Sequence, residues 1–168
     1  MKKLIVTLLI MVMLSSCAPA GKEVIDPDER YIYIVNLLEE HESYSSSSLY
    51  FNIEGEMAKI DEGYRYYITL DKPSIAMYDI ELLAIEKDVD YLTNMAPNVG
   101  IFEDTQYNMV PNQSDISNGF MKGIVASGLS DKPETTLYIF VQFKNYDFSN
   151  VHTEYIRLDI KYTEDTNE

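Results

Sequence analysis

The sequence predicts a mainly β protein, an antiparallel immunoglobulin-like β-sandwich of about seven strands that one N-terminal helix precedes. Apolar and polar residues alternate in successive segments between residues 49 and 163, and turn-forming residues separate these segments. No segment of this region has the continuous apolar run that is typical of a buried parallel strand. The alternative is an α+β fold, in which the helix packs on an open antiparallel sheet.

Residues 1–16 have the features of a signal peptide. Lys2 and Lys3 precede an apolar run from Leu4 to Leu14, which is too short for a membrane-spanning helix of about 20 residues. The run ends in Leu14-Ser15-Ser16-Cys17, which contains the only cysteine and resembles the lipobox of bacterial lipoproteins. That resemblance implies cleavage before Cys17 and a diacylglyceryl group on its sulfur, so we expect an extracytoplasmic protein anchored to the cell membrane. An ordinary signal peptide with Cys17 near its cleavage site is the other interpretation.

A tether at 17–26 leads into a helix predicted at 27–42. Asp26 is a suitable N-cap and Pro27 a suitable first helical residue. Apolar residues then follow at helical spacing, at Tyr31, Ile34, Val35 and Leu38. The start of this segment also has the composition of a strand. A Ser-rich segment at 43–48 follows, and its composition predicts a flexible link.

The β domain is predicted at 49–163, with six clear strands and one or two uncertain ones. The clear strands cover 49–57, 64–70, 78–84, 120–127, 137–144 and 155–160, and a short strand is expected near 99–102. Turn residues such as Gly and Pro separate several of them. Residues 88–118 are the least regular part of the domain, and 164–168 form a polar tail.

The charge of the chain excludes some partners. Removal of residues 1–16 takes two of the 13 Lys and Arg and none of the 28 Asp and Glu, which leaves a formal charge of −17. A chain this acidic repels phosphate backbones and anionic lipid headgroups, so no nucleic-acid partner is expected. With Cys17 lipidated no disulfide can form, and packing alone holds the fold.

No sequence pattern identifies a catalytic or metal site, and we predict no catalytic residue, metal ligand or cofactor. His41 and His152 are the two histidines, and no HExxH or paired CxxC motif accompanies them. No GxSxG elbow is present. Glu86, Asp88 and Asp90 would share one face of a strand and could attract Ca²⁺, but they lack the spacing of a calcium loop. A solvated strand end is the favoured interpretation.

Tyrosines form the candidate binding surface. Tyr50, Tyr67, Tyr138 and Tyr155 fall on strand faces opposite the aliphatic residues, and Phe140 shares the face of Tyr138. Tyrosine is enriched in recognition surfaces because it offers a large contact area at low entropic cost. The alternative is that loops or the N-terminal helix cover these rings, which would also account for Phe140.

A lipobox, a Ser-rich link and an immunoglobulin-like unit together resemble small surface lipoproteins of Gram-positive bacteria whose domains are described as of unknown function. Residues Gly123 to Ala126 and Leu137 to Asn145 carry most of this likeness, which implies location and fold but no activity. We expect a membrane-anchored, non-catalytic lipoprotein that binds an extracytoplasmic protein, peptide or wall glycan. The alternatives are a small exported hydrolase that uses carboxylates and a structural or exclusion role at the cell envelope.

Overall fold

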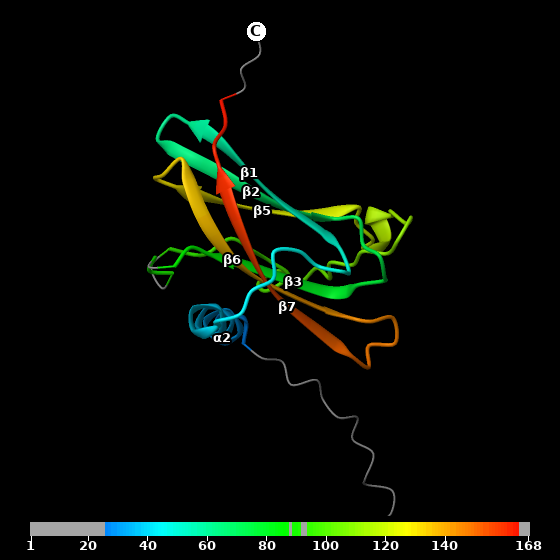
Figure 1. The fold of residues 1–168 in the computed structure, drawn as a ribbon. Helices are drawn as coiled ribbons and strands as arrows, with labels where there is room; N and C mark the ends of the chain where they lie inside the picture. Colours follow the sequence, from blue (N-terminus) through cyan, green and yellow to red (C-terminus); the bar gives the residue numbers. More distant parts are fainter. Residues whose placement is uncertain (1–25, 88, 92–93, 165–168) are drawn as a thin grey trace, which may run out of the picture.

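Two antiparallel sheets face each other in the computed structural model, which describes residues 26–87, 89–91 and 94–164 (Figure 1). The three-stranded sheet has the order β1-β2-β5, with β1 at Asn52–Ile60, β2 at Gly63–Asp71 and β5 at Gly123–Ser130. The four-stranded sheet has the order β4-β3-β6-β7, with β4 at Asn98–Val99, β3 at Tyr78–Ile85, β6 at Glu134–Lys144 and β7 at Val151–Lys161. Neither sheet closes into a barrel.

The strand order confirms the predicted immunoglobulin-like sandwich. Strands β1, β2 and β5 take the places of strands A, B and E of that fold, and β3, β6 and β7 take those of C, F and G. The short β4 pairs with the outer edge of β3 through Leu82–Val99 and Leu83–Asn98. Strand D of the constant-type domain lies beside strand E. No strand among the described residues occupies that place, so the outer edge of β5 is open.

The main core lies between the two sheets, and alternation along the strands builds it. On β6, the residues predicted to face inward are all fully buried: Leu137, Ile139, Val141 and Phe143. Strand β6 pairs with β7 in an unbroken register from Glu134–Lys161 to Lys144–Val151. Strand β6 is therefore one of the two central strands of the four-stranded sheet, and its inward side chains are all aliphatic or aromatic.

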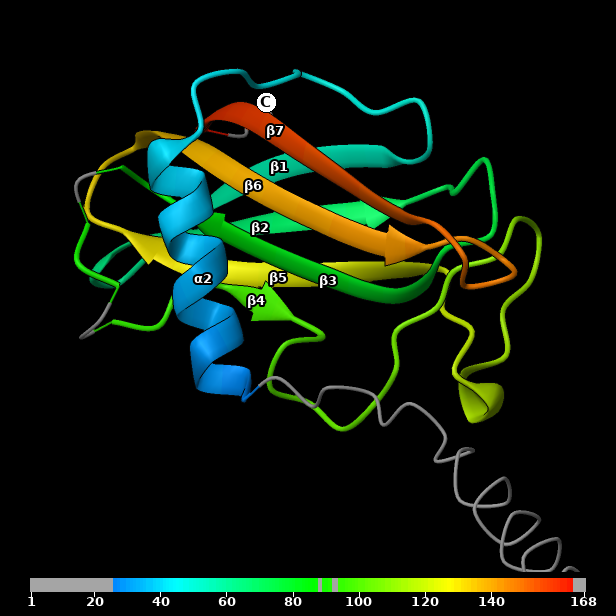
Figure 2. The same ribbon diagram turned by 90° about the horizontal axis from the view of Figure 1, so that it is seen from below.

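Helix α2, at Pro27–Glu40, covers the outer face of the four-stranded sheet (Figure 2). The Asp26 carboxylate accepts a hydrogen bond from the Asp28 amide at 2.9 Å, which confirms the predicted N-cap. The four predicted apolar residues of the helix are buried against β3 and β6 in a second core, which includes Tyr31, Ile34, Val35, Leu38, Leu83, Ile85 and Phe140. The helix ends two residues before the predicted boundary at 42. No described helix is long and apolar enough to cross a membrane.

The Ser-rich segment at 43–48 is more ordered than a flexible link. The Ser45 amide donates to the Tyr155 carbonyl at 3.0 Å, and the Arg157 amide donates to the Ser45 carbonyl at 2.9 Å. The Tyr44 hydroxyl donates to the Leu38 carbonyl at the end of α2. The segment therefore lies along the outer edge of β7, where the unpaired backbone N–H and C=O groups of an edge strand are available for hydrogen bonds.

Several strand boundaries differ from the prediction, and β6 and β7 begin earlier than expected, at Glu134 and Val151. Leu49 was expected on the inner face of a strand, but it is exposed and β1 begins only at Asn52. Phe120 was expected to begin a strand, but it forms isolated bridges with Asn108 and Asp115, and β5 begins at Gly123. The strand expected near 99–102 is Asn98–Val99, and a short 3₁₀ helix lies at Ile116–Asn118. The signal-like segment, Cys17 and most of the tether lie outside the described residues.

Candidate binding surfaces

The five aromatic residues predicted as a binding surface lie in three separate places. Tyr138, Phe140 and Tyr155 lie on the outer face of the four-stranded sheet, where Phe140 is opposite Tyr155. Phe140 is only 1% exposed, because α2 packs over it. The expectation that Phe140 forms part of an exposed face is therefore wrong, and the alternative of a covering helix is correct.

Tyr138 and Tyr155 are half-buried in an aromatic cluster at the end of α2. The ring of His41 stacks on that of Tyr155, and the ring of Tyr44 meets that of Tyr138 edge-on at 4.8 Å. The ammonium of Lys87 lies 4.5 Å from the Tyr138 ring centroid. Burial, and then the neighbouring tyrosines, raise the pKa of Tyr44 to about 12. These contacts attach the helix and the segment after it to the sheet.

Tyr50 and Tyr67 are remote from that cluster. Tyr67 lies on the outer face of the three-stranded sheet and is the one exposed member of the predicted set. Tyr50 precedes β1, and its ring is 5.7 Å from that of Phe143 and 5.3 Å from that of His152. Tyr50 therefore closes one end of the main core, and the predicted set does not form one continuous surface.

An exposed aromatic group that the sequence analysis did not identify lies at one end of the sandwich. The β2–β3 and β6–β7 loops are both at this end (Figure 2). Tyr146 is 78% exposed and Phe148 is 53% exposed. The ring of Tyr78 contacts Tyr146 at 6.2 Å, Phe148 at 5.1 Å and Phe120 at 6.5 Å between centroids. We call Tyr78, Phe120, Tyr146 and Phe148 the aromatic end.

Local hydrogen bonds hold the β6–β7 loop in one conformation. The Phe148 amide donates to the Asn145 carbonyl at 3.0 Å, and the Asn150 amide donates to the Asn145 side-chain oxygen at 3.1 Å. The Asp147 carboxylate accepts from the amide and hydroxyl of Ser149, and these bonds lower the pKa of Asp147. The loop is therefore ordered by its own polar side chains, and its two rings remain exposed.

Backbone strain is concentrated at this end of the molecule. Four described residues other than glycine have a left-handed backbone: Lys72, Asp79, Asn112 and Phe148. Phe148 has φ of 57°, which is unusual for a bulky residue. Asp79 has φ of 48° beside an irregularity in the β3–β6 register, and its carboxylate pairs with Lys144 at 2.7 Å. Such strain persists only where surrounding structure imposes it, and it is frequent at functional sites.

The sequence contains a signal for this surface. Tyr146 and Phe148 lie in a loop whose other residues are Asn145, Asp147, Ser149 and Asn150. Large rings two residues apart in a polar loop have no core strand to bury them, so their exposure could have been predicted. The left-handed conformation of Phe148 could not, because no local pattern specifies it.

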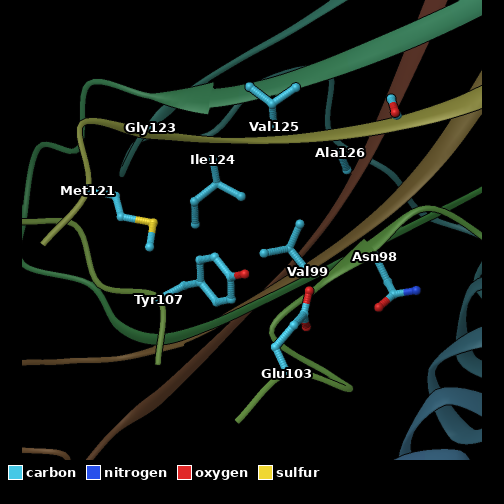
Figure 3. Close-up of a pocket in the computed structure, with 10 residues that line it drawn as sticks. Asn98, Val99, Glu103, Tyr107, Met121, Gly123, Ile124, Val125 and Ala126 are labelled. Carbon is cyan, nitrogen blue, oxygen red and sulfur yellow. The ribbon is translucent and has the colours of Figure 1, made fainter. Parts of the chain in front are cut away.

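A groove beside the open edge of β5 is the second candidate surface (Figure 3). It has a volume of about 400 Å³, and β5 lines one side of it from Gly123 to Ser127. The side chains of Glu103 and Tyr107, from the segment between β4 and β5, point into it from the other side. Burial, followed by the charge of Glu103, raises the pKa of Tyr107.

Among the residues that the structure describes, the histidines and carboxylates considered in the sequence form no metal site. His152 stacks on Phe143 with 5.0 Å between ring centroids, so it packs on a ring as His41 does. Glu86 accepts a hydrogen bond from the Thr135 hydroxyl, and Asp88 lies outside the described residues. In the described part of the chain, no group of three or more His, Cys, Asp or Glu could hold a metal ion.

Comparison with known proteins does not identify a family. No protein-family model and no curated protein matches the chain. A solved structure described as "X-ray structure of Northeast Structural Genomics Consortium target SoR45" is similar over 68% of this chain and 87% of that chain, with 11% identity and a TM-score of 0.40. A similarity at this level supports no inference about function.

Proposed function

We propose that this protein is a membrane-anchored surface lipoprotein whose immunoglobulin-like domain binds an extracytoplasmic protein, peptide or wall glycan without catalysis. The lipobox-like Leu14-Ser15-Ser16-Cys17 supports the location and the anchor. The observation that carries the binding function is the ordered loop that exposes Tyr146 and Phe148 beside Tyr78.

The free protein holds these two rings in an unfavourable state. Burial of an apolar ring stabilises a complex by about 25 cal/mol for each Å² of apolar area removed from water, and the exposed rings lack this stabilisation in the free protein. Phe148 adds the cost of a left-handed backbone, about 1–2 kcal/mol for a residue with a Cβ. A partner that covers the rings recovers the first term, and the ordered loop limits the entropy lost on binding. The loop is therefore suited to contact with a ligand.

The position of the loop in the fold supports the same conclusion. The β2–β3 and β6–β7 loops correspond to the B–C and F–G loops, which carry binding residues at one end of variable immunoglobulin domains. The β6–β7 loop also has the composition of such surfaces, since Tyr, Ser and Asn supply rigid area and adaptable hydrogen bonds.

The test uses the full-length protein in mild detergent and the variant with both Tyr146→Ala and Phe148→Ala. Each is mixed with purified cell-wall sacculi in one experiment and with detergent-solubilised envelope proteins in another. We expect saturable binding to one of these fractions, with a loss of about 2 kcal/mol or more in the variant, as for other central aromatic contacts.

The matched control carries Ile32→Ala and Tyr33→Ala, which remove two exposed apolar side chains from α2. It should bind as the unaltered protein does. Equal binding by the loop variant and the unaltered protein would contradict the assignment of the aromatic end. Turnover on a panel of hydrolase substrates would contradict the non-catalytic function.

A further inference from the structure

The open edge of β5 is the least protected sheet edge in the described part of the chain. Strand β4 has only two residues, and β7 carries Glu154, Arg157 and Asp159 and pairs with Ser45 at Ile156. Strand β1 carries charged residues along its length, namely Glu54, Glu56 and Lys59. Charges, short length and covering segments are the usual means by which proteins block an edge.

Strand β5 is not short and carries no charged side chain, and Pro97 lies against it only towards its C-terminal end, at Gly128. Its eight residues, Gly123–Ser130, include no ionisable side chain and no proline, and its pairing with β2 is continuous from Gly123–Asp71 to Ser130–Tyr64. Val125 is 57% exposed and Leu129 is 62% exposed, both on the outer face. An uncharged and regular edge of this length is a template for one more strand.

The groove leaves open space along the first five residues of this edge. From Gly123 to Ser127 the edge of β5 borders a space of about 400 Å³, and Tyr107 and Glu103 lie across it (Figure 3). This is the place of strand D beside strand E in constant-type domains. The side chains of an added strand would alternate between the groove and the outer face beside Val125.

We propose that an extended peptide segment of a partner protein adds to the edge of β5, with one basic side chain directed at Glu103. No Lys or Arg is among the described residues that line the groove. The Glu103 carboxylate is held in place by a 2.9 Å hydrogen bond from the Gly100 amide. A basic side chain is complementary to this carboxylate and to the formal charge of −15 of the whole chain.

A second copy of the chain fits this edge less well. Pairing of β5 with the β5 strand of a second copy would bring together two chains that each have a formal charge of −15. These chains repel each other, and β5 contains no basic residue that would offset the repulsion. The site also goes beyond the proposed function, because it shares no residue with the aromatic end and its test does not depend on Tyr146 or Phe148.

The experiment measures binding of a fluorescent nine-residue peptide to the full-length protein in detergent. In the peptide, valine alternates with threonine, and lysine replaces the central threonine. We expect saturable binding below about 1 mM, the weak end of specific recognition. Binding should slow hydrogen exchange at residues 123–127. A peptide with glutamate at the centre, or with alternate amides methylated, should bind at least about tenfold more weakly.

Two protein variants make the test specific. Val125→Lys places a charge on the open edge, and Thr69→Lys places the same charge opposite Val125 on the central strand of the same sheet. Val125→Lys and Glu103→Lys should weaken binding of the lysine peptide about tenfold, whereas Thr69→Lys should leave it unchanged.

Several results would overturn the proposal. The proposal is wrong if the lysine peptide shows no saturable binding up to about 1 mM, or if the lysine and glutamate peptides bind equally well. It is also wrong if Val125→Lys and Thr69→Lys change the affinity for the lysine peptide by the same amount. Hydrogen exchange at residues 123–127 could also slow as the protein concentration rises in the absence of peptide. That result would show that a second copy of the chain binds the edge, and it would overturn the proposal.

Discussion

The ring of His41, just beyond the last turn of α2, stacks on the ring of Tyr155 of β7 with centroids 3.7 Å apart and planes inclined by 16°. Tyr155 also meets Phe140 at 5.9 Å, and Phe140 lies beneath the helix. The chain after the helix is bound to the same strand through Ser45. The helix is thus attached to the sheet at its buried face and at its C-terminal end.

Helix docking contributes to the stability of the whole domain, and Leu38→Ala tests this. Leu38 is fully buried between the helix and the sheet, so its truncation should lower the free energy of unfolding by about 2–5 kcal/mol. Chemical denaturation followed by circular dichroism measures the change. Ile32→Ala, on the exposed face of the same helix, should change it by less than about 0.5 kcal/mol. A small effect of Leu38→Ala would mean that the helix is only loosely attached.

Buried tyrosines make the fold sensitive to alkaline pH. Burial raises the pKa of Tyr44 and of Tyr91 to about 12, and it raises the pKa of Tyr66 further above its ordinary value. In the unfolded chain these groups lose their protons near pH 10. Between about pH 10 and 12 the unfolded state therefore binds fewer protons than the folded state, and stability falls as the pH rises.

Urea unfolding at a series of pH values, with the ultraviolet absorbance of tyrosinate as a second probe, measures this loss. Stability should be constant from neutral pH to about pH 9 with respect to these tyrosines and should decline above pH 10. Tyr44→Phe should reduce the slope of the decline, whereas Tyr146→Phe, at an exposed ring, should leave it unchanged. An equal slope in all three proteins would show that Tyr44 ionises as freely in the folded state as in the unfolded state.

Much of the fold could be predicted because its determinants are local. The alternation of apolar and polar residues in β6 specifies which side chains face the core, and it does so independently of which strands pair with β6. Asp26 and Pro27 specify the start of α2, since N-capping depends on a few neighbouring residues. The covering of Phe140 by α2 was only one of two interpretations, because the pattern of β6 does not show whether the helix packs over this face.

The candidate sites depend on contacts that local patterns do not specify. The open edge of β5 exists because β5 pairs with β2 alone, and pairing order is a property of the whole chain. The groove exists because Glu103 and Tyr107 face β5 from a segment of irregular sequence. Tyr67 could be placed on a strand face, but it lies on the other sheet from Tyr138, and Tyr50 precedes β1 instead of belonging to it.

Gly100 determines the position of one wall of the groove, and Gly100→Ala should be strongly destabilising. Gly100 has φ of 79°, and a Cβ at this position would collide with the Ile80 carbonyl oxygen. Gly119 has a similar φ of 77°, but the nearest atom to its Cβ would be 3.5 Å away, on Asn108. Gly119→Ala should therefore cost about 1–2 kcal/mol from backbone strain alone. Gly100→Ala should cost clearly more, and similar losses in a thermal melt would contradict this account.

The proposed lipid anchor is tested by Cys17→Ser. An acyl chain contributes about 0.8 kcal/mol for each buried CH₂, and two chains give stable attachment to a bilayer. The variant should leave the membrane fraction after cell fractionation or should remain as the unprocessed precursor on a gel. Ser16→Ala, which keeps a small residue before the cysteine, should behave as the unaltered protein does. Unchanged retention and mobility of Cys17→Ser would mean that Cys17 carries no lipid.

Comparison of Phe148→Gly with Phe148→Ala separates the strain of the β6–β7 loop from the contacts of its ring. Both changes remove the ring and its contact with Tyr78, which is worth about 0.5–1.5 kcal/mol. Only glycine also removes the cost of the left-handed backbone, about 1–2 kcal/mol. Phe148→Gly should therefore be more stable than Phe148→Ala by about 1 kcal/mol and close to the unaltered protein in urea unfolding. Both variants should bind equally weakly to the envelope fraction that the unaltered protein binds, because the proposed contact is made by the ring. If the two variants are equally stable, the backbone at Phe148 is not strained.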